Sequence, residues 1–401
     1  MKIISRAIDV TVRERARPGY DALGLPLGAF LAYPKIELGV QANSNIYGQP
    51  NNAKSDVIGI IDPEIDLVSR WARNSLTAFV RTATNEYVRS PSEDTTDWQF
   101  GGKGRLDLGD SALNVGGDYG YLAEPRTASI GANLATFATI HPIEYYQTDA
   151  NADFVHTFNR LQVQGGVTYA SSQFQNGVDA QHASVVETVF DNSRTVVSGK
   201  AGYAVSPDTA IYASVGYNTI NYPNQVVTAT TLNRNSSGET YDVGANFEFT
   251  QLIRGDVEVG YLNQDFSAAH FKSVQGFHAL GKVEWFPSQL TTVTFTGQRD
   301  VDPATLAGSP SVVVGVVGAQ VDHELLRNLI LTGIARYTDD SYQGIARHDQ
   351  IGELTVSGDY LLNRSVGLHL AYDYLTQDST GTSRGVNFND NRVTLSTTLQ
   401  Y

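Results

Sequence analysis

Apolar and polar residues alternate along most of the chain. In Tyr241–Thr250, YDVGANFEFT, one face takes Tyr241, Val243, Ala245, Phe247 and Phe249, and the other takes the polar and small residues. The same period of two recurs in residues 98–108, 161–169, 211–218 and 366–374. A period of two is that of a β-strand whose two faces meet different surroundings, and almost no segment has the helical period. We therefore predict an all-β protein.

The connections between these segments alternate between short and long. Gly109-Asp110, residues 206–208 and Arg327-Asn328 carry tight-turn residues. The long, polar or small-residue connections are residues 47–55, 90–97, 126–142, 175–192, 224–236 and 303–311. An up-and-down meander, with all turns at one end and all loops at the other, produces this alternation. The segments from Phe30 to Tyr401 number about 18, within a range of about 16 to 18, as in membrane barrels of even strand number.

Alternation alone fits a soluble sheet as well as a membrane barrel, but the aromatic residues favour the barrel. Five tyrosines fall about seven to ten residues beyond the preceding short turn, at a rise of about 3.3 Å per residue: Tyr169, Tyr217, Tyr261, Tyr337 and Tyr372. Trp71, Trp285 and Phe286 lie beside short turns, near the opposite edge. Two aromatic girdles at the headgroup levels are typical of barrels that cross a membrane with their strands.

Charged residues occupy the middle of the polar faces. The predicted lumen-facing residues are Lys103, Arg105, Asp118, Lys200, Asp242, Glu248, Glu258, Lys282, Glu284, Arg336, Asp359 and Asp373. A dry core could not accept these charges cheaply, whereas a water-filled lumen, or the outer face of a soluble sheet, could. Acids outnumber bases on these faces, so a pore lined by them would mildly prefer cations.

The chain ends on another alternating segment, Arg392–Tyr401. Its apolar residues Val393, Leu395, Leu399 and Tyr401 would form the lipid face of a last strand that pairs with the first and closes the barrel. The terminal aromatic resembles the signal that the outer-membrane assembly machinery reads in Gram-negative barrels. We predict a transmembrane up-and-down antiparallel barrel over residues 29–401, in a Gram-negative outer membrane, preceded by a periplasmic arm over residues 1–28.

Composition removes several other classes of protein. The net charge of −14, with 28 Lys and Arg against 42 Asp and Glu, repels phosphate backbones, so no nucleic-acid partner is expected. The chain has no cysteine and hence neither a disulfide framework nor a Cys-based metal site. Its longest apolar run is about eight residues, below the length that a spanning helix needs. The first ten residues lack the apolar region of a signal peptide, which we expect to have been removed.

No catalytic, metal-binding or cofactor-binding motif is recognisable. H-E-x-x-H and G-x-S-x-G do not occur. Asp322 and His323 are neighbours, but adjacent strand residues point to opposite faces, so we interpret them as a surface pair near a short turn. His278 and His369 fall on lumen faces without a catalytic partner at useful spacing. We predict that the protein is not an enzyme and has no cofactor.

The N-terminal stretch Val10–Tyr47 resembles a known family. It contains Arg17-Pro18-Gly19-Tyr20-Asp21, then Leu27-Gly28-Ala29-Phe30, then Asn45-Ile46-Tyr47. These elements are similar to the opening of the outer-membrane barrels called β-barrel porin type 2, which usually have Asp-Asp or Asp-Asn where this chain has Ser44-Asn45. The resemblance covers about 40 residues and implies a porin-like conduit. Some barrels of this kind are encoded beside exopolysaccharide secretion genes.

We therefore expect a channel that passes small hydrophilic solutes or saccharides by diffusion. The alternatives are the barrel component of an exopolysaccharide secretion system, a structural or adhesive barrel, and a soluble β-rich binding protein. Residues 126–142 either fold into the lumen as a constriction or pack outside it. The expected partners are the lipid bilayer and lipopolysaccharide, the outer-membrane assembly machinery and, in the secretion alternative, a periplasmic polysaccharide-export protein.

Overall fold

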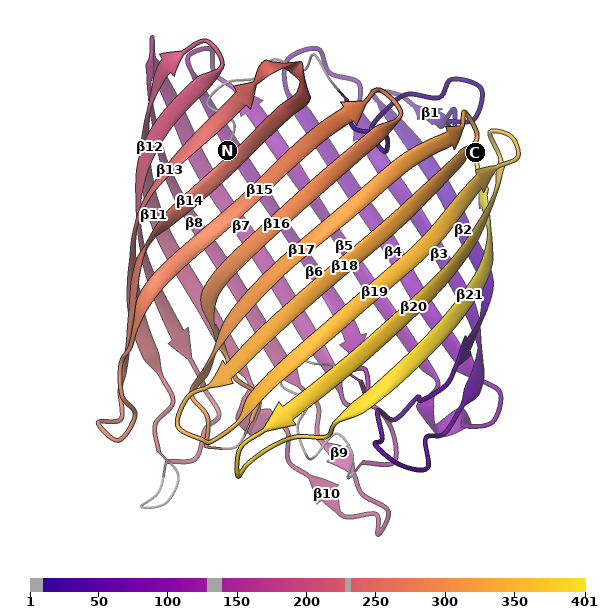
Figure 1. The fold of residues 1–401 in the computed structure, drawn as a ribbon, viewed down its shortest axis with the longest axis vertical. Coiled ribbons are helices and arrows are strands. Elements are labelled where there is room, and N and C mark those ends of the chain that lie inside the picture. The colour runs from indigo at the N-terminus through magenta and orange to yellow at the C-terminus, as the bar shows by residue number, and fades with distance from the viewer. Residues whose placement is uncertain (1–9, 128–138, 228–231, 307) are drawn as a thin grey trace.

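The computed structural model is a closed barrel of long antiparallel strands (Figure 1). It describes residues 10–127, 139–227, 232–306 and 308–401. Over these residues the main sheet has 19 strands, of which β1 has three residues, leaving 18 that span the wall. The predicted fold class is thereby confirmed. No helix of this part of the chain is long and apolar enough to cross a membrane.

The first half of the wall and its short elements have the following bounds. The strands are β1 (Leu25–Leu27), β2 (Phe30–Asn43), β3 (Asp56–Ser69), β4 (Ser75–Tyr87), β5 (Thr95–Asp107), β6 (Ser111–Ala123), β7 (Glu144–Phe158), β8 (Leu161–Phe174), β9 (Gly177–Val178), β10 (Ser184–Val185), β11 (Asn192–Ser206) and β12 (Thr209–Asn221). The 3-10 turns are η1 (Pro91–Glu93), η3 (Thr188–Phe190) and η4 (Thr250–Leu252).

The second half of the wall consists of longer strands on average. Its strands are β13 (Ser236–Phe249), β14 (Ile253–Phe266), β15 (Val274–Ser288), β16 (Thr291–Pro303), β17 (Ser311–Leu326), β18 (Leu329–Tyr342), β19 (His348–Leu361), β20 (Val366–Thr380) and β21 (Phe388–Gln400).

Each long strand pairs with its neighbours in the chain, and the ends meet. β8 pairs with β11 because β9 and β10 form a separate hairpin within a loop. β2 pairs with β21 from Lys35↔Gln400 to Asn43↔Arg392, which closes the barrel. Closure leaves no strand edge with unpaired backbone groups in the wall. The short turns gather at one end, the top in Figure 1, and the long loops with β9 and β10 at the other.

The outer face of the wall is apolar and exposed. Val215 on β12 and Val243 on β13 expose 54% and 61% of their surface, although they are cross-strand neighbours of other apolar residues. Their chain neighbours Ser214 and Asp242 face the lumen, where Ser214 lines a cavity. A continuous exposed apolar belt of this kind marks a surface that is covered by something other than water. In a closed barrel with a polar interior, that covering is lipid.

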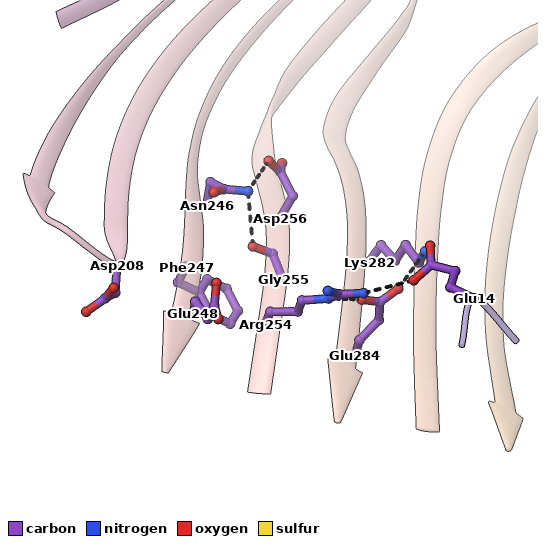
Figure 2. Close-up of a pocket in the computed structure, with 10 residues that line it drawn as sticks. All are labelled: Glu14, Asp208, Asn246, Phe247, Glu248, Arg254, Gly255, Asp256, Lys282 and Glu284. Atoms are coloured by element: carbon purple, nitrogen blue, oxygen red, sulfur yellow. Dashed lines mark hydrogen bonds and ion pairs between the residues drawn. The ribbon is translucent and has the colours of Figure 1, made fainter. Parts of the chain in front are cut away.

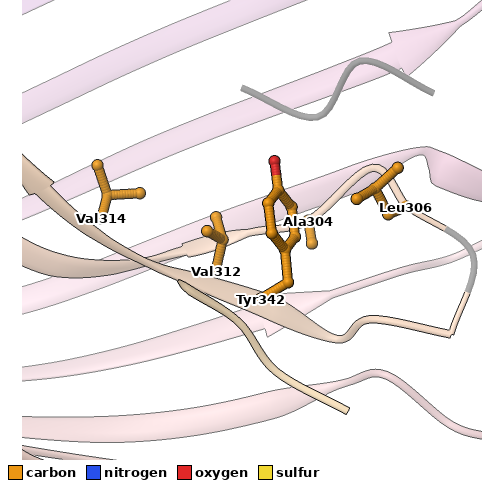
Figure 3. Packing of buried hydrophobic residues seen from close by; sticks show 5 residues of the cluster. All are labelled: Ala304, Leu306, Val312, Val314 and Tyr342. Atoms are coloured by element: carbon orange, nitrogen blue, oxygen red, sulfur yellow. The ribbon is translucent and has the colours of Figure 1, made fainter. Parts of the chain in front are cut away.

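Clusters of buried apolar residues form where loops fold over the long-loop mouth. Ala304, Leu306, Val312, Val314 and Tyr342 make one such cluster (Figure 3). The Tyr222 hydroxyl, beyond the end of β12, donates to the carbonyl oxygens of Ala304 and Pro310 at 3.0 and 2.9 Å. Burial raises the pKa of this tyrosine above its usual value. Two connections, 222–235 and 304–310, are thus joined to each other at the mouth.

Gly260, in the middle of β14, offers a test of how closely the strands of the wall pack. A Cβ atom at Gly260 would lie well inside 3.0 Å of the Tyr241 carbonyl oxygen and the Asp242 carboxylate. We expect Gly260→Ala to lower the free energy of unfolding by about 1–3 kcal/mol, as overpacking does. At Gly297 the added Cβ meets nothing within 4 Å, so Gly297→Ala should be neutral or stabilise by about 0.4–1 kcal/mol. Urea unfolding in detergent compares the two; equal midpoints would contradict this packing.

Candidate functional site in the barrel lumen

A large lumen cavity lies beside the middle of the barrel wall. Its volume is about 760 Å³, and strands β7, β8 and β11 to β16 contribute its lining. Lys200, Asp242, Glu258 and His278, all four predicted to fall on lumen faces, line it. Because inward-facing side chains alternate with lipid-facing ones along each strand, neighbouring strands deliver these charges to one surface. The cavity therefore offers both signs of charge to a solute.

Three potential metal ligands converge in this cavity. Ligand atoms of Asp242, Glu258 and His278 lie within 4.8 Å of one another. His278 Nδ1 is 2.6 Å from an oxygen of Asp242, and Gly260 lies opposite both residues in register. Glu258 accepts a hydrogen bond from Ser214 at 3.1 Å and lies 3.6 Å from Lys200 Nζ. The carboxylates thus already have protein partners, and a lysine cation competes with any metal, so we interpret the cluster as a polar patch of the lumen.

A charged bridge narrows the lumen toward the long-loop mouth. Arg194 on β11 binds Asp300 and Asp302 on β16, at 2.8 and 2.7 Å. Four strands lie between β11 and β16 in the sheet. The β15–β16 pairing ends at Ala279↔Arg299, whereas β16 runs on to Pro303 paired with β17. The end of β16 is thus released from β15, which allows its acids to meet Arg194.

A second charged strip lies on β2 and β3. It consists of Lys35, Glu37, Asp62, Glu64 and Asp66, and the Lys35 and Glu64 side chains are 2.7 Å apart. This strip was not among the predicted lumen residues, because Asp62-Pro63-Glu64 has the composition of a turn. Within this strip the β3–β4 pairing lacks residues 62 and 63, consistent with a proline that has no N–H to donate. The signal that could have found it is the alternation of these acids with Ile61, Ile65 and Leu67.

At the short-turn end, a small cavity of about 200 Å³ is lined by charged residues (Figure 2). Arg254 contacts Glu284, and Lys282 Nζ is 2.8 Å from the same carboxylate. Glu14, from the segment that precedes the barrel, lies 3.5 Å from Arg254. Part of the N-terminal segment thus lies within the barrel.

Eight of the predicted lumen residues line cavities of the barrel: Lys103, Asp118, Lys200, Asp242, Glu248, Glu258, Lys282 and Glu284. Lys103 and Arg105 are on β5, Asp118 on β6, Lys200 on β11, Asp242 and Glu248 on β13, Glu258 on β14, Lys282 and Glu284 on β15, Arg336 on β18, Asp359 on β19 and Asp373 on β20. The structure brings Lys200, Asp242 and Glu258 together, and Lys282 and Glu284 together, but spreads the others around the wall. Asp359, Glu284 and Lys200 also have partners that chain spacing does not reveal, namely Arg13, Arg254 and Tyr212.

The aromatic residues divide between the two faces. Tyr169, Tyr217, Tyr261, Tyr337, Tyr372, Trp71 and Trp285 are all outside, with exposures between 39% and 48%. Phe286 lies beside the same short turn as Trp285, but its side chain is buried. It is only 6% exposed, and the Arg254 guanidinium lies 5.1 Å from its ring centroid. On the last strand, Val393, Leu395, Leu399 and the terminal Tyr401 also expose 41–56% of their surface.

The structure corrects what was predicted for Asp322 and for the two lumen histidines. Asp322 is not a surface residue: it is 3% exposed and binds Arg13, whereas His323 contacts Thr291. His278 and His369 do have acidic partners, Asp242 and Asp359, each at 2.6 Å. Asp242 lies two strands away from His278, and Asp359 lies on the strand next to His369, so motif spacing along the chain did not show these partners. Each pair consists of a histidine and a carboxylate. Catalysis of acyl transfer would also need a nucleophile that donates to the histidine.

A serine lies in register beside one of these pairs. Ser396 on β21 is the cross-strand partner of His369. Its hydroxyl, however, donates to Glu37 at 2.5 Å, and the residue is 2% exposed. A triad needs the hydroxyl to donate to the imidazole. The row Asp359, His369, Ser396 is therefore a polar network of the wall.

Residues 126–142 are described only at their ends, because 128–138 lie outside the described residues. Arg126 binds Glu93 at 2.7 Å, and both side chains are buried. Thr139 forms a bridge with Asp179, and the Ile140 N–H donates to the Val178 carbonyl oxygen at 2.9 Å. The two ends are thus held at the mouth, by η1 and by the β9 hairpin. The constriction remains a prediction.

A family model described as "Putative beta-barrel porin 2" matches residues 17–401 of the chain. No curated protein matches the sequence. Among solved structures, Pseudomonas aeruginosa OccK2 (OpdF), in complex with glucuronate, has a TM-score of 0.47 at 11% identity, over 95% of this chain and 99% of that one. P. aeruginosa OpdL has a TM-score of 0.46 at 14% identity, over 93% and 99%. The P. aeruginosa ferric enterobactin receptor has a TM-score of 0.48 at 6% identity, over 92% and 80%.

Proposed function

Because the chain belongs to the beta-barrel porin 2 family, which matches residues 17–401, we propose that it is a diffusion channel for small hydrophilic solutes or saccharides. Its barrel belongs in an outer membrane, where lipid and lipopolysaccharide surround it. The observation that carries the proposal is the charged cavity of about 760 Å³ inside a closed 18-strand wall. Barrels of about 16 to 18 strands leave an aqueous channel, whereas about eight strands are filled by their own side chains.

Charge on the lumen wall supports a preference for cations. The strip on β2 and β3 has four acids and one lysine, and Asp300 and Asp302 share one arginine. Rings and strips of acidic side chains raise the local concentration of cations in a pore. The proposed channel has no catalytic step, and it needs no cofactor.

Uptake by proteoliposomes tests the proposal. Purified, folded protein should admit neutral sugars at rates that fall with sugar size, because the lumen is narrowed by side chains at both ends. Empty liposomes and liposomes with heat-denatured protein are the controls. Uptake equal to these controls, from protein that migrates as a folded barrel, would contradict diffusion.

Replacing Arg194 tests the charged bridge. Arg194→Gln removes the cation that binds Asp300 and Asp302 while keeping a polar side chain. One unit charge about 4 Å from an ion is worth about 1 kcal/mol in water, so we expect the cation-to-anion permeability ratio to rise by up to about fivefold at low salt. Reversal potentials under a salt gradient measure this ratio. Arg327→Gln, at an exposed short turn, should leave it unchanged, and an equal response of both variants would exclude a role for the bridge.

Secretion of an exopolysaccharide is the alternative function. What supports it is that loops at one mouth and the N-terminal segment at the other both narrow the lumen. Such a barrel would depend on a periplasmic polysaccharide-export protein to open it. It would then be silent alone and would conduct or transport only when that partner is added, which the uptake experiment distinguishes.

A further inference from the structure

Residues 10–17, here called the lumen arm, lie inside the barrel at its short-turn end. Val12 is completely buried, and its N–H donates to the Thr292 hydroxyl of β16 at 3.0 Å. The arm is locally folded, since the N–H groups of Glu14 and Arg15 both donate to the Thr11 carbonyl oxygen, at 3.1 and 3.0 Å. A buried backbone needs such partners, and here the barrel wall supplies one of them.

Three arginines attach the arm to acids of the wall. Arg13 binds Asp322 on β17 at 3.0 Å and Asp359 on β19 at 2.8 Å. Arg15 and Arg17 both bind Glu324 on β17, at 3.0 and 3.2 Å. The side chains of Asp322 and Glu324 are only 4% and 8% exposed.

The pKa of Arg13 agrees with this attachment. Burial alone lowers it, but the hydrogen bonds and charges of Asp322 and Asp359 outweigh the burial and raise the pKa above its ordinary value. Arg13 is therefore charged at neutral pH. Its attachment to the two acids depends on their ionisation and not on its own.

The arm changes the charge of this end of the lumen. It adds three arginines and one glutamate, a net charge of +2, against the three wall acids that the arginines bind. In the opposite sense, the acid Glu14 of the arm lies 3.5 Å from the base Arg254 on β14 of the wall (Figure 2). The arm is thus matched to the wall in both signs of charge, as an occupant that belongs there would be.

The contacts of the arm are confined to one arc of the wall. The arm reaches β14, β16, β17, β18 and β19. Round the barrel, β19 is followed by β20, β21, β2 and β3, and on β2 and β3 Lys35, Glu37, Asp62 and Glu64 line another cavity of about 360 Å³. The arm therefore contacts one arc of the wall, and the acidic strip begins three strands beyond β19.

We propose that the lumen arm controls passage at the short-turn end of the channel, cancelling the negative charge of the wall and narrowing the opening. This inference rests on the proposed channel function. It makes Arg13, Arg15 and Arg17 specificity-determining residues, although they lie outside the barrel sequence. With the arm in place, anions can pass this end of the pore. With the three arginine charges removed, the carboxylates of Asp322, Glu324 and Asp359 face the permeating ions without a counter-charge.

The test compares three variants of the full chain by reversal potential and single-channel conductance in a planar bilayer under a KCl gradient. The triple variant Arg13→Gln, Arg15→Gln, Arg17→Gln should raise the ratio of potassium to chloride permeability by at least about fivefold, the effect of one unit charge at about 4 Å in water. Its conductance should also rise. The charge-keeping variant with lysine at the same three positions should retain the wild-type ratio.

A matched control removes the same charge elsewhere. Arg70, Arg160 and Arg327 are exposed at short turns, and their triple glutamine variant should behave as wild type. Heat-dependent mobility on gels shows which variants are folded. Selectivity that is unchanged in the folded Arg13/15/17 glutamine variant, or shifted equally in the control, would overturn the proposal.

A cross-link locates the arm without using conductance. The chain has no cysteine, so Val12→Cys with Thr292→Cys creates one possible disulfide, between residues that already share a 3.0 Å hydrogen bond. Oxidation should remove the reactivity of both thiols toward a maleimide. Val12→Cys with Thr77→Cys, on β4 of the opposite wall, should keep both thiols reactive. Equal cross-linking of the two pairs would overturn docking of the arm.

The two readouts separate the two proposals. If the Val12–Thr292 cross-link forms but wild type and every variant are silent, the channel function fails while docking of the arm stands. If wild type conducts and the glutamine variant is identical to it, the arm proposal fails while the channel stands. A silent wild type with a conducting glutamine variant would support control by the arm and would contradict free diffusion through the wild-type barrel.

Discussion

Val167→Arg should lower the free energy of unfolding of the barrel by about 2–4 kcal/mol, the cost of an arginine on the lipid face at the bilayer midplane. Val167 lies in the middle of β8, is 42% exposed, and has Ala152 and Val197 as its cross-strand neighbours. An arginine there would have no water and no acidic partner. Urea unfolding of protein folded into lipid vesicles measures the loss.

The adjacent residue supplies the control. Thr168 lines the large lumen cavity, so Thr168→Arg places the same side chain in water and should change stability by no more than about 0.5 kcal/mol, as surface substitutions do. It should instead reduce cation selectivity. If both arginine variants were equally stable, the outer face would not be in contact with lipid, and the interpretation as a soluble β-rich protein would gain support.

Arg347→Met should cost still more, about 3–5 kcal/mol, because it leaves a buried carboxylate without its counter-ion. The Arg347 side chain is 3% exposed and donates from Nε and Nη2 to Asp349, which is fully buried, at 2.9 and 2.6 Å. Asp340, opposite Asp349 in register, is also fully buried. Within the described residues neither carboxylate oxygen of Asp340 has a hydrogen-bond partner. Arg347 is therefore the cation beside two buried acids.

The same pair of strands contains an exposed ion pair for comparison. Arg336 on β18 and Glu353 on β19 are 3.4 Å apart, with side chains 55% and 39% exposed. Arg336→Met should cost less than about 1 kcal/mol, as is typical of surface pairs. Unfolding midpoints in denaturant, with heat-dependent gel mobility as the test of folding, compare the variants. If Arg347→Met lowered the free energy of unfolding no more than Arg336→Met, water would have to reach the buried pair.

The barrel itself could be predicted because its cause is local. Each strand shows its two faces in its own sequence: in β13, Tyr241 and Val243 alternate with Asp242. The alternation of short and long connections then orders the strands, and Val393 and Leu395 place the last strand in the wall against β2. Where a local signal was misleading, as at Pro63 in the middle of β3, a charged strip of the lumen was missed.

The contacts within the lumen could not be predicted, because they join residues that are distant in sequence and differ in height along the barrel. Arg194 meets Asp300 through a release of β16 from β15 that no pattern announces. Arg13 reaches Asp322 across more than 300 residues. Its sequence setting shows only a run of arginines before the first strand, which is typical of an arm but says nothing of where the arm lies.

Single-channel recording of the purified wild-type protein in a planar bilayer, under a KCl gradient, tests the central claim most directly. A water-filled lumen with acidic strips predicts stepwise current and a reversal potential on the cation-selective side. Protein that is demonstrably folded and inserted, yet passes no current either as wild type or with Arg13, Arg15 and Arg17 replaced by glutamine, would contradict an open channel through this barrel.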